Sequence, residues 1–173
     1  MAYSPVVDAE LAEEIPPGLE TKLRRVLSVM HAPAFDRMAP VQRCRTILEL
    51  EYALVGIAMV YLTRHPKTPN LYDSGIRYRY QPAAMGIDLP DQWWTLPTVY
   101  ARGEGSCEDL AAIRVAELKL FGQTDYDRSA RPVVHSKEGA GSAPSVYHVV
   151  VRFRDDQEED PSYLLGMRPA WAA

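Results

Sequence analysis

The chain has 173 residues, of which 47% are hydrophobic and 24% charged, and its formal net charge is −4 at pH 7. These are ordinary globular values, and the length suits one domain that can bury a proper core. The acidic balance, with no basic stripe to compensate for it, argues against a nucleic-acid-binding protein. Two cysteines, Cys44 and Cys107, make no disulfide framework, which favours a reducing compartment.

The N-terminal segment is predicted to be a flexible acidic arm over residues 1–17. It contains three prolines and several acidic residues, a composition that buries too little apolar surface to fold. A single domain is expected over residues 18–173. The N-terminal segment is acidic and has neither the basic region nor the apolar core of a secretory signal. We therefore expect a protein that is not secreted by a signal peptide.

Two helices are predicted next, over Leu19–His31 and Arg43–Arg64. In the second helix apolar residues recur at helical spacing, and Cys44 is expected to pack there as a small hydrophobic side chain. Its strongest apolar run, Tyr52 to Leu62, has eleven residues, which is too short to span a bilayer. We interpret the segment as a core helix and expect no membrane contact.

An extended segment, Gly75–Tyr80, is predicted before a Pro- and Gly-rich connection over residues 81–105. Aromatic and arginine residues alternate in the extended segment, as they do in a strand. The connection carries Trp93 and Trp94, and core packing accounts for most such tryptophans. The functional alternative is that Trp93 and Trp94 line a substrate-binding groove.

A cysteine-bearing helix is predicted in the segment GEGSCEDLAAIRVAEL. Ser106 and Asp109 form a capping-box-like pattern before an apolar run. Cys107 then lies in the first turn, where unpaired backbone N–H groups and the helix dipole stabilise a thiolate or an oxyanion. Glu108 and Asp109 oppose thiolate formation, so a cationic neighbour is needed. The remaining charged side chains of this helix are expected to face solvent: Arg114, Glu117 and Lys119.

A histidine in a strand is predicted to be the cationic neighbour of Cys107, and a later aspartate is predicted to orient that histidine. The run Val146 to Phe153 is rich in β-branched residues and is typical of a strand. His148 within it would act as general base toward Cys107 and then as acid toward the leaving group. The following turn can bring Asp160, stiffened by Pro161, back beside His148 to fix the ring tautomer.

His135 is the competing candidate for the role of base. It lies beside a Ser/Gly/Ala/Pro-rich stretch, residues 136–145, that is typical of a surface loop, so a solvated histidine is expected there. The four histidines are scattered and show no spacing typical of metal ligands. We expect neither a metal nor a cofactor.

Each member of the proposed triad also has a structural interpretation. A cysteine at a helix start is usually a small buried side chain, a strand histidine usually packs, and an Asp-Pro pair is usually a turn. Cys107, His148 and Asp160 nevertheless occur in this order within about fifty residues. Their combination favours nucleophile, base and orienting group.

These segments resemble the transglutaminase-like superfamily, whose core pattern is a cysteine at a helix start, a strand histidine and a downstream aspartate. The likeness covers roughly residues 93–167. GEGSCEDLAAIRVAEL and EDPSYLLGM more narrowly resemble small transglutaminase-like proteins of tailed bacteriophages, and PNLYDSGIRY extends this likeness to about residue 69. The superfamily often has an aromatic residue soon after its histidine, whereas Val149 and Val150 stand here.

The resemblance implies an α+β fold with a transglutaminase-like, papain-like core, in which N-terminal helices and the cysteine helix pack on a small antiparallel sheet. It implies a cysteine-dependent peptidase, isopeptidase or acyl transferase that works through a thioester on a protein or peptide substrate. Cys107 would be the nucleophile, His148 the base and Asp160 the orienting residue. Since Asp-rich calcium loops are absent from the sequence, calcium-dependent transglutamination is not expected.

A phage likeness also keeps a structural alternative open. The fold could serve as a structural or docking component of a phage particle, with little or no catalysis and with other phage structural proteins as partners. Either function implies that the protein acts in the host cytoplasm or in the virion.

Overall fold

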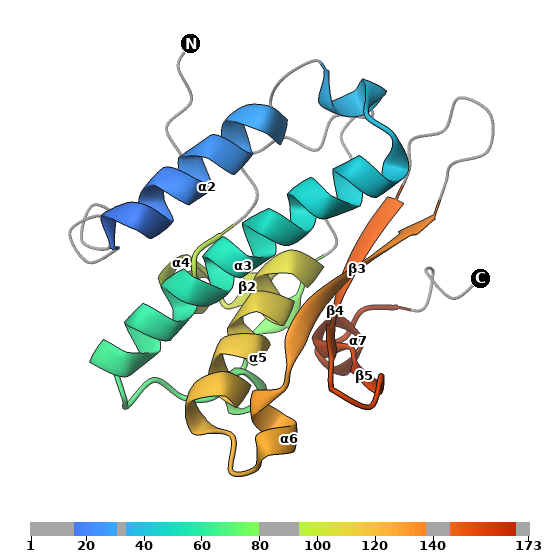
Figure 1. Cartoon of the computed structure of the whole chain (residues 1–173). Helices are drawn as coiled ribbons and strands as arrows, with labels where there is room; N and C mark the ends of the chain where they lie inside the picture. The colour runs from blue at the N-terminus through green and yellow to red at the C-terminus, as the bar shows by residue number, and fades with distance from the viewer. Residues whose placement is uncertain (1–15, 31–33, 80–93, 138–145, 169–173) are drawn as a thin grey trace.

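The computed structural model describes residues 16–30, 34–79, 94–137 and 146–168 (Figure 1). Most of the predicted arm lies outside the described residues, and helix α2 (Pro17–Met30) begins at its last residue. Two long helices, α3 (Pro40–Arg64) and α5 (Cys107–Phe121), lie at the centre of the fold. The shorter elements are η1 (Phe35–Arg37), η2 (Leu71–Asp73), β1 (Arg77–Tyr78), α4 (Leu96–Arg102), β2 (Glu104–Gly105), α6 (Asp125–Arg128) and α7 (Pro161–Leu164).

Helix α3 is the core helix that the sequence predicts. It starts earlier than expected because Pro40 suits the first helical position, where its missing N–H costs nothing. The helix packs against α2, α5 and β3, as Figure 1 shows. By length and composition alone α3 is apolar enough to cross a membrane, but its packing is that of a core helix. Its buried apolar side chains are Ile47, Leu50, Ala53, Leu54, Val55, Ile57, Ala58 and Leu62.

The predicted small antiparallel sheet is confirmed. Its strands are β3 (Arg131–Lys137), β4 (Val146–Arg152) and β5 (Glu158–Glu159), in the order β3-β4-β5. The strand β5 pairs only with Val151 and Arg152 of β4. The fold is therefore a mixed α+β structure in which helices α3 and α5 pack on a three-stranded antiparallel sheet.

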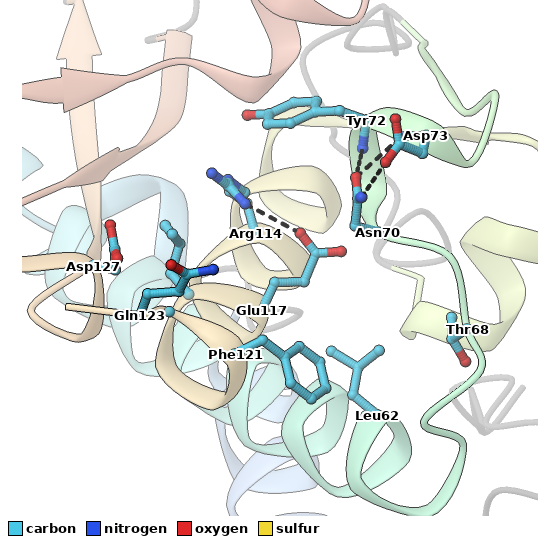
Figure 2. A pocket seen from close by; sticks show the side chains of 12 residues that line it. Leu62, Thr68, Asn70, Tyr72, Asp73, Arg114, Glu117, Phe121, Gln123 and Asp127 are labelled. Carbon is cyan, nitrogen blue, oxygen red and sulfur yellow. Dashed lines mark hydrogen bonds and ion pairs between the residues drawn. The ribbon is translucent and has the colours of Figure 1, made fainter.

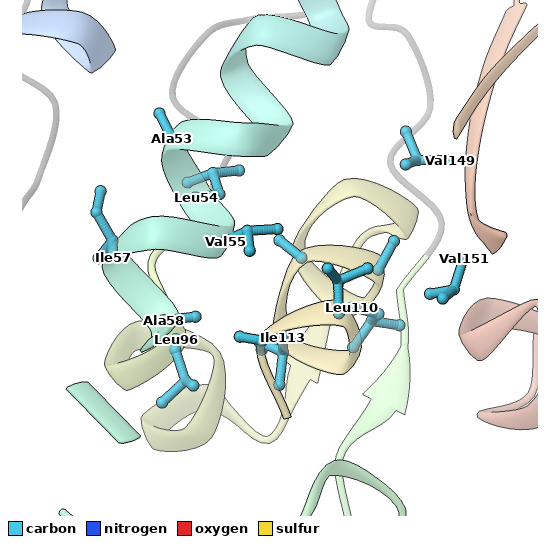
Figure 3. Close-up of a cluster of buried hydrophobic side chains, with 14 of the residues drawn as sticks. Ala53, Leu54, Val55, Ile57, Ala58, Leu96, Leu110, Ile113, Val149 and Val151 are labelled. Atoms are coloured by element: carbon cyan, nitrogen blue, oxygen red, sulfur yellow. The ribbon is translucent and has the colours of Figure 1, made fainter. Parts of the chain in front are cut away.

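The central strand β4 is buried on both faces. Val149 and Val151 belong to the core that α3 and α5 share (Figure 3). Strict alternation places His148 and Val150 on the other face, and each of them is only 4% exposed. This double burial explains the near-continuous apolar run that marked the strand in the sequence.

Two predictions about charged side chains are wrong. Glu117 is only 4% exposed, and Arg114 is half-buried, because both face inward toward η2 and β5 instead of solvent. In both cases a partner far along the chain explains the burial: Glu159 for Arg114 and the Leu71 N–H for Glu117.

His135 lies on β3, which continues into the first residues of the predicted loop, and its ring contacts Glu158 at 3.0 Å. Its side chain stays 38% exposed, as the prediction of a solvated histidine requires.

Candidate active site

Cys107 begins helix α5, as the capping pattern predicts. The Asp109 carboxylate accepts hydrogen bonds from the Ser106 backbone N–H and from its hydroxyl, both at 3.0 Å. One carboxylate thereby provides the hydrogen-bond acceptor for both Ser106 donors at the helix start. The thiol of Cys107 is 7% exposed. The cap therefore fixes the cysteine at the helix start, with its side chain turned into the protein.

The electrostatics of this position favour the thiol over the thiolate. Burial raises the pKa of Cys107 well above its ordinary value, and the neighbouring Glu108 raises it further. The thiol donates a hydrogen bond to the Glu108 carboxylate at 3.1 Å. A hydrogen bond from the backbone of Val149 lowers the pKa but does not offset burial. The sulfur is therefore protonated at neutral pH, and the helix N-terminus alone does not activate it.

His148 and Asp160 form a hydrogen-bonded pair, as predicted. The Nε2 atom of His148 lies 2.8 Å from Oδ2 of Asp160. Asp160 also caps α7, since its Oδ1 accepts from the Tyr163 backbone N–H at 3.2 Å. Partial burial raises the pKa of Asp160, but the interaction with His148 and the backbone hydrogen bonds from Tyr163 and Ser162 together outweigh it, and the net pKa lies below the ordinary value. An ionised aspartate thus holds the imidazole of a buried histidine.

The cysteine approaches this pair at the edge of β4. Its sulfur bonds the backbone of Val149, which directly follows His148. The strand β5 ends opposite Val151, so the first turn of α5 can reach this part of β4. Because Asp160 holds Nε2, Nδ1 is the ring nitrogen that would serve the thiol. The structure brings Cys107 to the strand that carries His148, but alternation turns the His148 side chain toward the face of β4 opposite the core that α5 shares. A direct sulfur-to-imidazole contact stays a prediction.

The two tryptophans predicted to bind substrate have different outcomes. Trp93 lies outside the described residues. Trp94 is half-buried against the core, and its backbone N–H donates to Asp109 at 2.8 Å. Its ring lies under the guanidinium groups of Arg79 and Arg102, at 5.4 and 4.4 Å from the ring centroid. Trp94 thus contacts the start of the cysteine helix, and substrate binding by it stays a prediction.

Glu51 is a charged residue of this region that the sequence analysis missed. Its side chain is fully buried on α3, and neither carboxylate oxygen has a hydrogen-bond partner among the described residues. Burial raises its pKa well above the ordinary value, and the nearby Glu108 and Asp109 raise it further. The signal was present, because Glu51 stands four residues after Ile47 and so falls on the apolar face of the helix.

Asp109 is the second buried acid at this end of α5. Burial raises its pKa to about 8, although the hydrogen bonds from Ser106 and Trp94 act in the opposite direction. Glu51 and Glu108 both raise the pKa of Cys107. The cysteine therefore sits among acids that favour protonated states.

A cavity of about 510 Å³ lies farther along α5 (Figure 2). Arg114, Glu117 and Phe121 line it, whereas Cys107 and His148 do not. Within the described ranges no group of His, Cys, Asp and Glu is arranged to hold a metal ion. The chemistry of the site therefore has to be argued from the side chains around Cys107.

Comparison with protein families, curated proteins and solved structures finds no match to this chain. A transglutaminase-like core and a phage origin accordingly stay predictions from the sequence resemblance.

Proposed function

We propose that the protein is a cysteine-dependent amide hydrolase, a peptidase or isopeptidase, or an acyl transferase, acting on a protein or peptide substrate. The observation that carries the proposal is the His148–Asp160 pair, in which Nε2 and Oδ2 lie 2.8 Å apart. His148 stands on the strand whose backbone bonds the Cys107 sulfur. A nucleophile, a base and an orienting group on adjacent elements are the parts that such catalysis requires. The resemblance to the transglutaminase-like superfamily assigns the same three roles.

In the acylation step, His148 takes the proton of the Cys107 thiol, and the sulfur attacks the amide carbonyl carbon. The Asp160 carboxylate stabilises the imidazolium that forms. Collapse of the tetrahedral intermediate breaks the C–N bond, and His148 returns the proton to the departing amine. Backbone N–H groups at the start of α5 are suited to stabilise the oxyanion. The acyl group is then held on Cys107 as a thioester.

In the second step, water or an amine attacks the thioester carbonyl. His148 takes a proton from that nucleophile and passes it to the departing Cys107 sulfur, which restores the thiol. Water gives a carboxylic acid and completes hydrolysis, whereas an amine gives a new amide and completes transfer. We favour hydrolysis of a peptide or isopeptide bond.

The protonated resting state of Cys107 fits a base-assisted mechanism better than a preformed thiolate. Burial and Glu108 raise the pKa of Cys107, so the proton leaves the sulfur only if a base accepts it. His148, held by an ionised Asp160, is the base that the site offers. Reactivity of Cys107 must therefore depend on His148.

The test is the rate of iodoacetamide alkylation of Cys107, followed by mass spectrometry from about pH 5 to pH 10. Cys44, a half-buried thiol of the same chain, serves as the internal reference. We expect His148→Ala to slow Cys107 and leave Cys44 unchanged, and Asp160→Asn to retain more reactivity than His148→Ala. Turnover of a peptide substrate should vanish in Cys107→Ala. Coincident alkylation of wild type and His148→Ala at every pH would remove the hydrolase from consideration.

A second candidate, a structural or docking component of a phage particle, is favoured by one observation. The Cys107 thiol is 7% exposed and hydrogen-bonded to Glu108, which is what a packing cysteine requires. In that case Cys107→Ser should assemble normally, and the thiol should react without regard to His148. The host cytoplasm or the virion is the proposed location in either case.

A further inference from the structure

Arg114 makes a network of contacts that links α5 to β5. Its Nε donates to Oε1 of Glu159 at 2.6 Å, and its Nη2 lies 3.4 Å from Oε2 of the same carboxylate. The guanidinium also stacks over the ring of Tyr72 at 4.9 Å, and the Tyr72 hydroxyl donates to Glu159. A two-point Arg–carboxylate contact fixes orientation as well as distance.

Strand β5, which this network contacts, is too short to be fixed by backbone pairing alone. Strand β5 has only two residues, Glu158 and Glu159, and pairs with only two residues of β4. Asp160, which orients His148, follows it directly. The strand that leads into Asp160 therefore depends on side-chain contacts for its position.

The two residues of β5 are fastened on opposite faces. Glu158 faces away from α5, where Arg152 donates to it at 2.8 Å and His135 contacts it at 3.0 Å. Glu159 faces α5 and is held there by Arg114. The contact to Glu158 stays within the sheet, whereas the contact to Glu159 ties the sheet to the helix that begins with Cys107.

We propose that Arg114 is a positioning residue: by holding Glu159 it keeps Asp160 against His148 and fixes that pair relative to the helix of Cys107. Arg114 lies about two turns beyond Cys107 on α5, so one rigid helix carries both the sulfur and the guanidinium that holds Glu159. The effect on catalysis rests on the function proposed above, but the effect on the His148–Asp160 contact does not.

The first measurement is the titration of the Asp160 carboxyl carbon by NMR, in wild type, Arg114→Lys and Glu159→Ala. Arg114→Lys keeps the charge but loses the two-point contact. Glu159→Ala removes a negative charge, which by itself would lower the pKa of Asp160 further. Loss of the His148 contact acts in the opposite direction, because that bond keeps the pKa low. We expect the pKa of Asp160 to rise in both variants.

Arg24→Met is the matched control, since Arg24 forms a 2.7 Å pair with Glu20 on α2, a helix that carries no residue of the site. It should leave the titration of Asp160 unchanged. An unchanged or lowered pKa of Asp160 in folded Arg114→Lys and Glu159→Ala overturns the proposal. Should Glu159→Ala fail to fold, Glu159→Gln keeps the size of the side chain but loses the two-point ion pair with Arg114, and an unchanged titration of Asp160 there has the same consequence.

The second measurement separates this proposal from the proposed function. In Arg114→Lys the His148-dependent part of Cys107 alkylation should fall about tenfold to a hundredfold, since small misplacements cost that much. If the pKa of Asp160 rises in the variants but Cys107 alkylation in wild type does not depend on His148, the positioning role of Arg114 stands and the proposed hydrolase is rejected. If Cys107 alkylation in Arg114→Lys depends on His148 as strongly as in wild type, the hydrolase stands and the positioning role of Arg114 is rejected.

Discussion

The start and the middle of α5 bury acidic side chains in opposite ways. At the start, Glu51 has no hydrogen-bond partner among the described residues, and Asp109 is held only by neutral donors of Ser106 and Trp94. Two turns later, Glu117 and Glu159 both contact the guanidinium of Arg114. An uncompensated acidic region thus surrounds the start of α5, and a compensated one surrounds its middle.

The difference has a physical consequence. The acids around the start of α5 are stabilised in their protonated forms, whereas the ion pairs around Arg114 fix the positions of the elements that they join. An unpaired buried acid avoids its charge by raising its pKa, as Glu51 does. Burial also raises the pKa of Glu117, but the Leu71 N–H and Arg114 act against that rise. Uncompensated buried acids are costly, and they concentrate at functional sites. That is the arrangement around Cys107.

The largest expected effect is the pH dependence that the uncompensated region gives to folding. The ordinary pKa values are 4.5 for Glu51 and 3.8 for Asp109, and burial raises the first and shifts the second to about 8. The native state then holds protons that the unfolded state releases. The stability that these two carboxyls contribute is therefore complete below about pH 4, and the part from Asp109 is lost as the pH rises toward its folded pKa of about 8. The shift of Asp109 alone should make the free energy of unfolding in urea roughly 3 kcal/mol lower at pH 8 than at pH 5. A flat profile would contradict the comparison.

The next effect concerns the compensated region. Arg114→Met leaves Glu159 and Glu117 half-buried or buried without their cation, which should destabilise the fold by about 2 kcal/mol in urea at pH 7. Arg24→Met breaks an exposed pair and should cost less than about 1 kcal/mol. Equal losses in the two variants would show that the Arg114 network is no stronger than a surface ion pair.

Local patterns predicted the elements of this fold well. The helix spacing of the apolar residues identified α3, the Ser106–Asp109 cap located the start of α5, and the β-branched run identified β4. Each of these signals lies within one segment of the chain. The His148–Asp160 contact followed from a strand and a turn, which are also local features.

Long-range compensation was not predictable in the same way. Arg114 and Glu117 have the sequence context of a solvent-facing helix side, and only Glu159 and the Leu71 N–H, far along the chain, explain their burial. The raised pKa of Cys107 comes first from burial, then from the adjacent Glu108, and only in a smaller part from Glu51, which stands on another helix. Sequence spacing indicated which residues could react, whereas their protonation also depends on burial, which packing between distant segments decides.

A smaller effect is expected when one uncompensated acid is removed. Glu51→Met replaces an unpartnered buried carboxyl with an apolar side chain of similar size, which should stabilise the protein by about 1–2 kcal/mol at pH 7. The pH dependence of unfolding should also become shallower. Glu49→Met, on the same helix but exposed, is the control and should change stability by less than about 0.5 kcal/mol. Destabilisation by Glu51→Met would mean that the carboxyl has a partner essential to the fold.

The smallest expected effect tests how the acids act on the thiol itself. Glu108→Gln keeps a side chain of the same size beside the Cys107 sulfur but removes the charge that helps raise the pKa of Cys107. Alkylation of Cys107 at pH 7 should therefore become about threefold faster, a modest gain because burial, the largest cause, is unchanged. Cys44 should react as in wild type. Slower alkylation in Glu108→Gln would assign Glu108 the opposite role, as the group that accepts the thiol proton, and the base of the site would then have to be sought there instead of at His148.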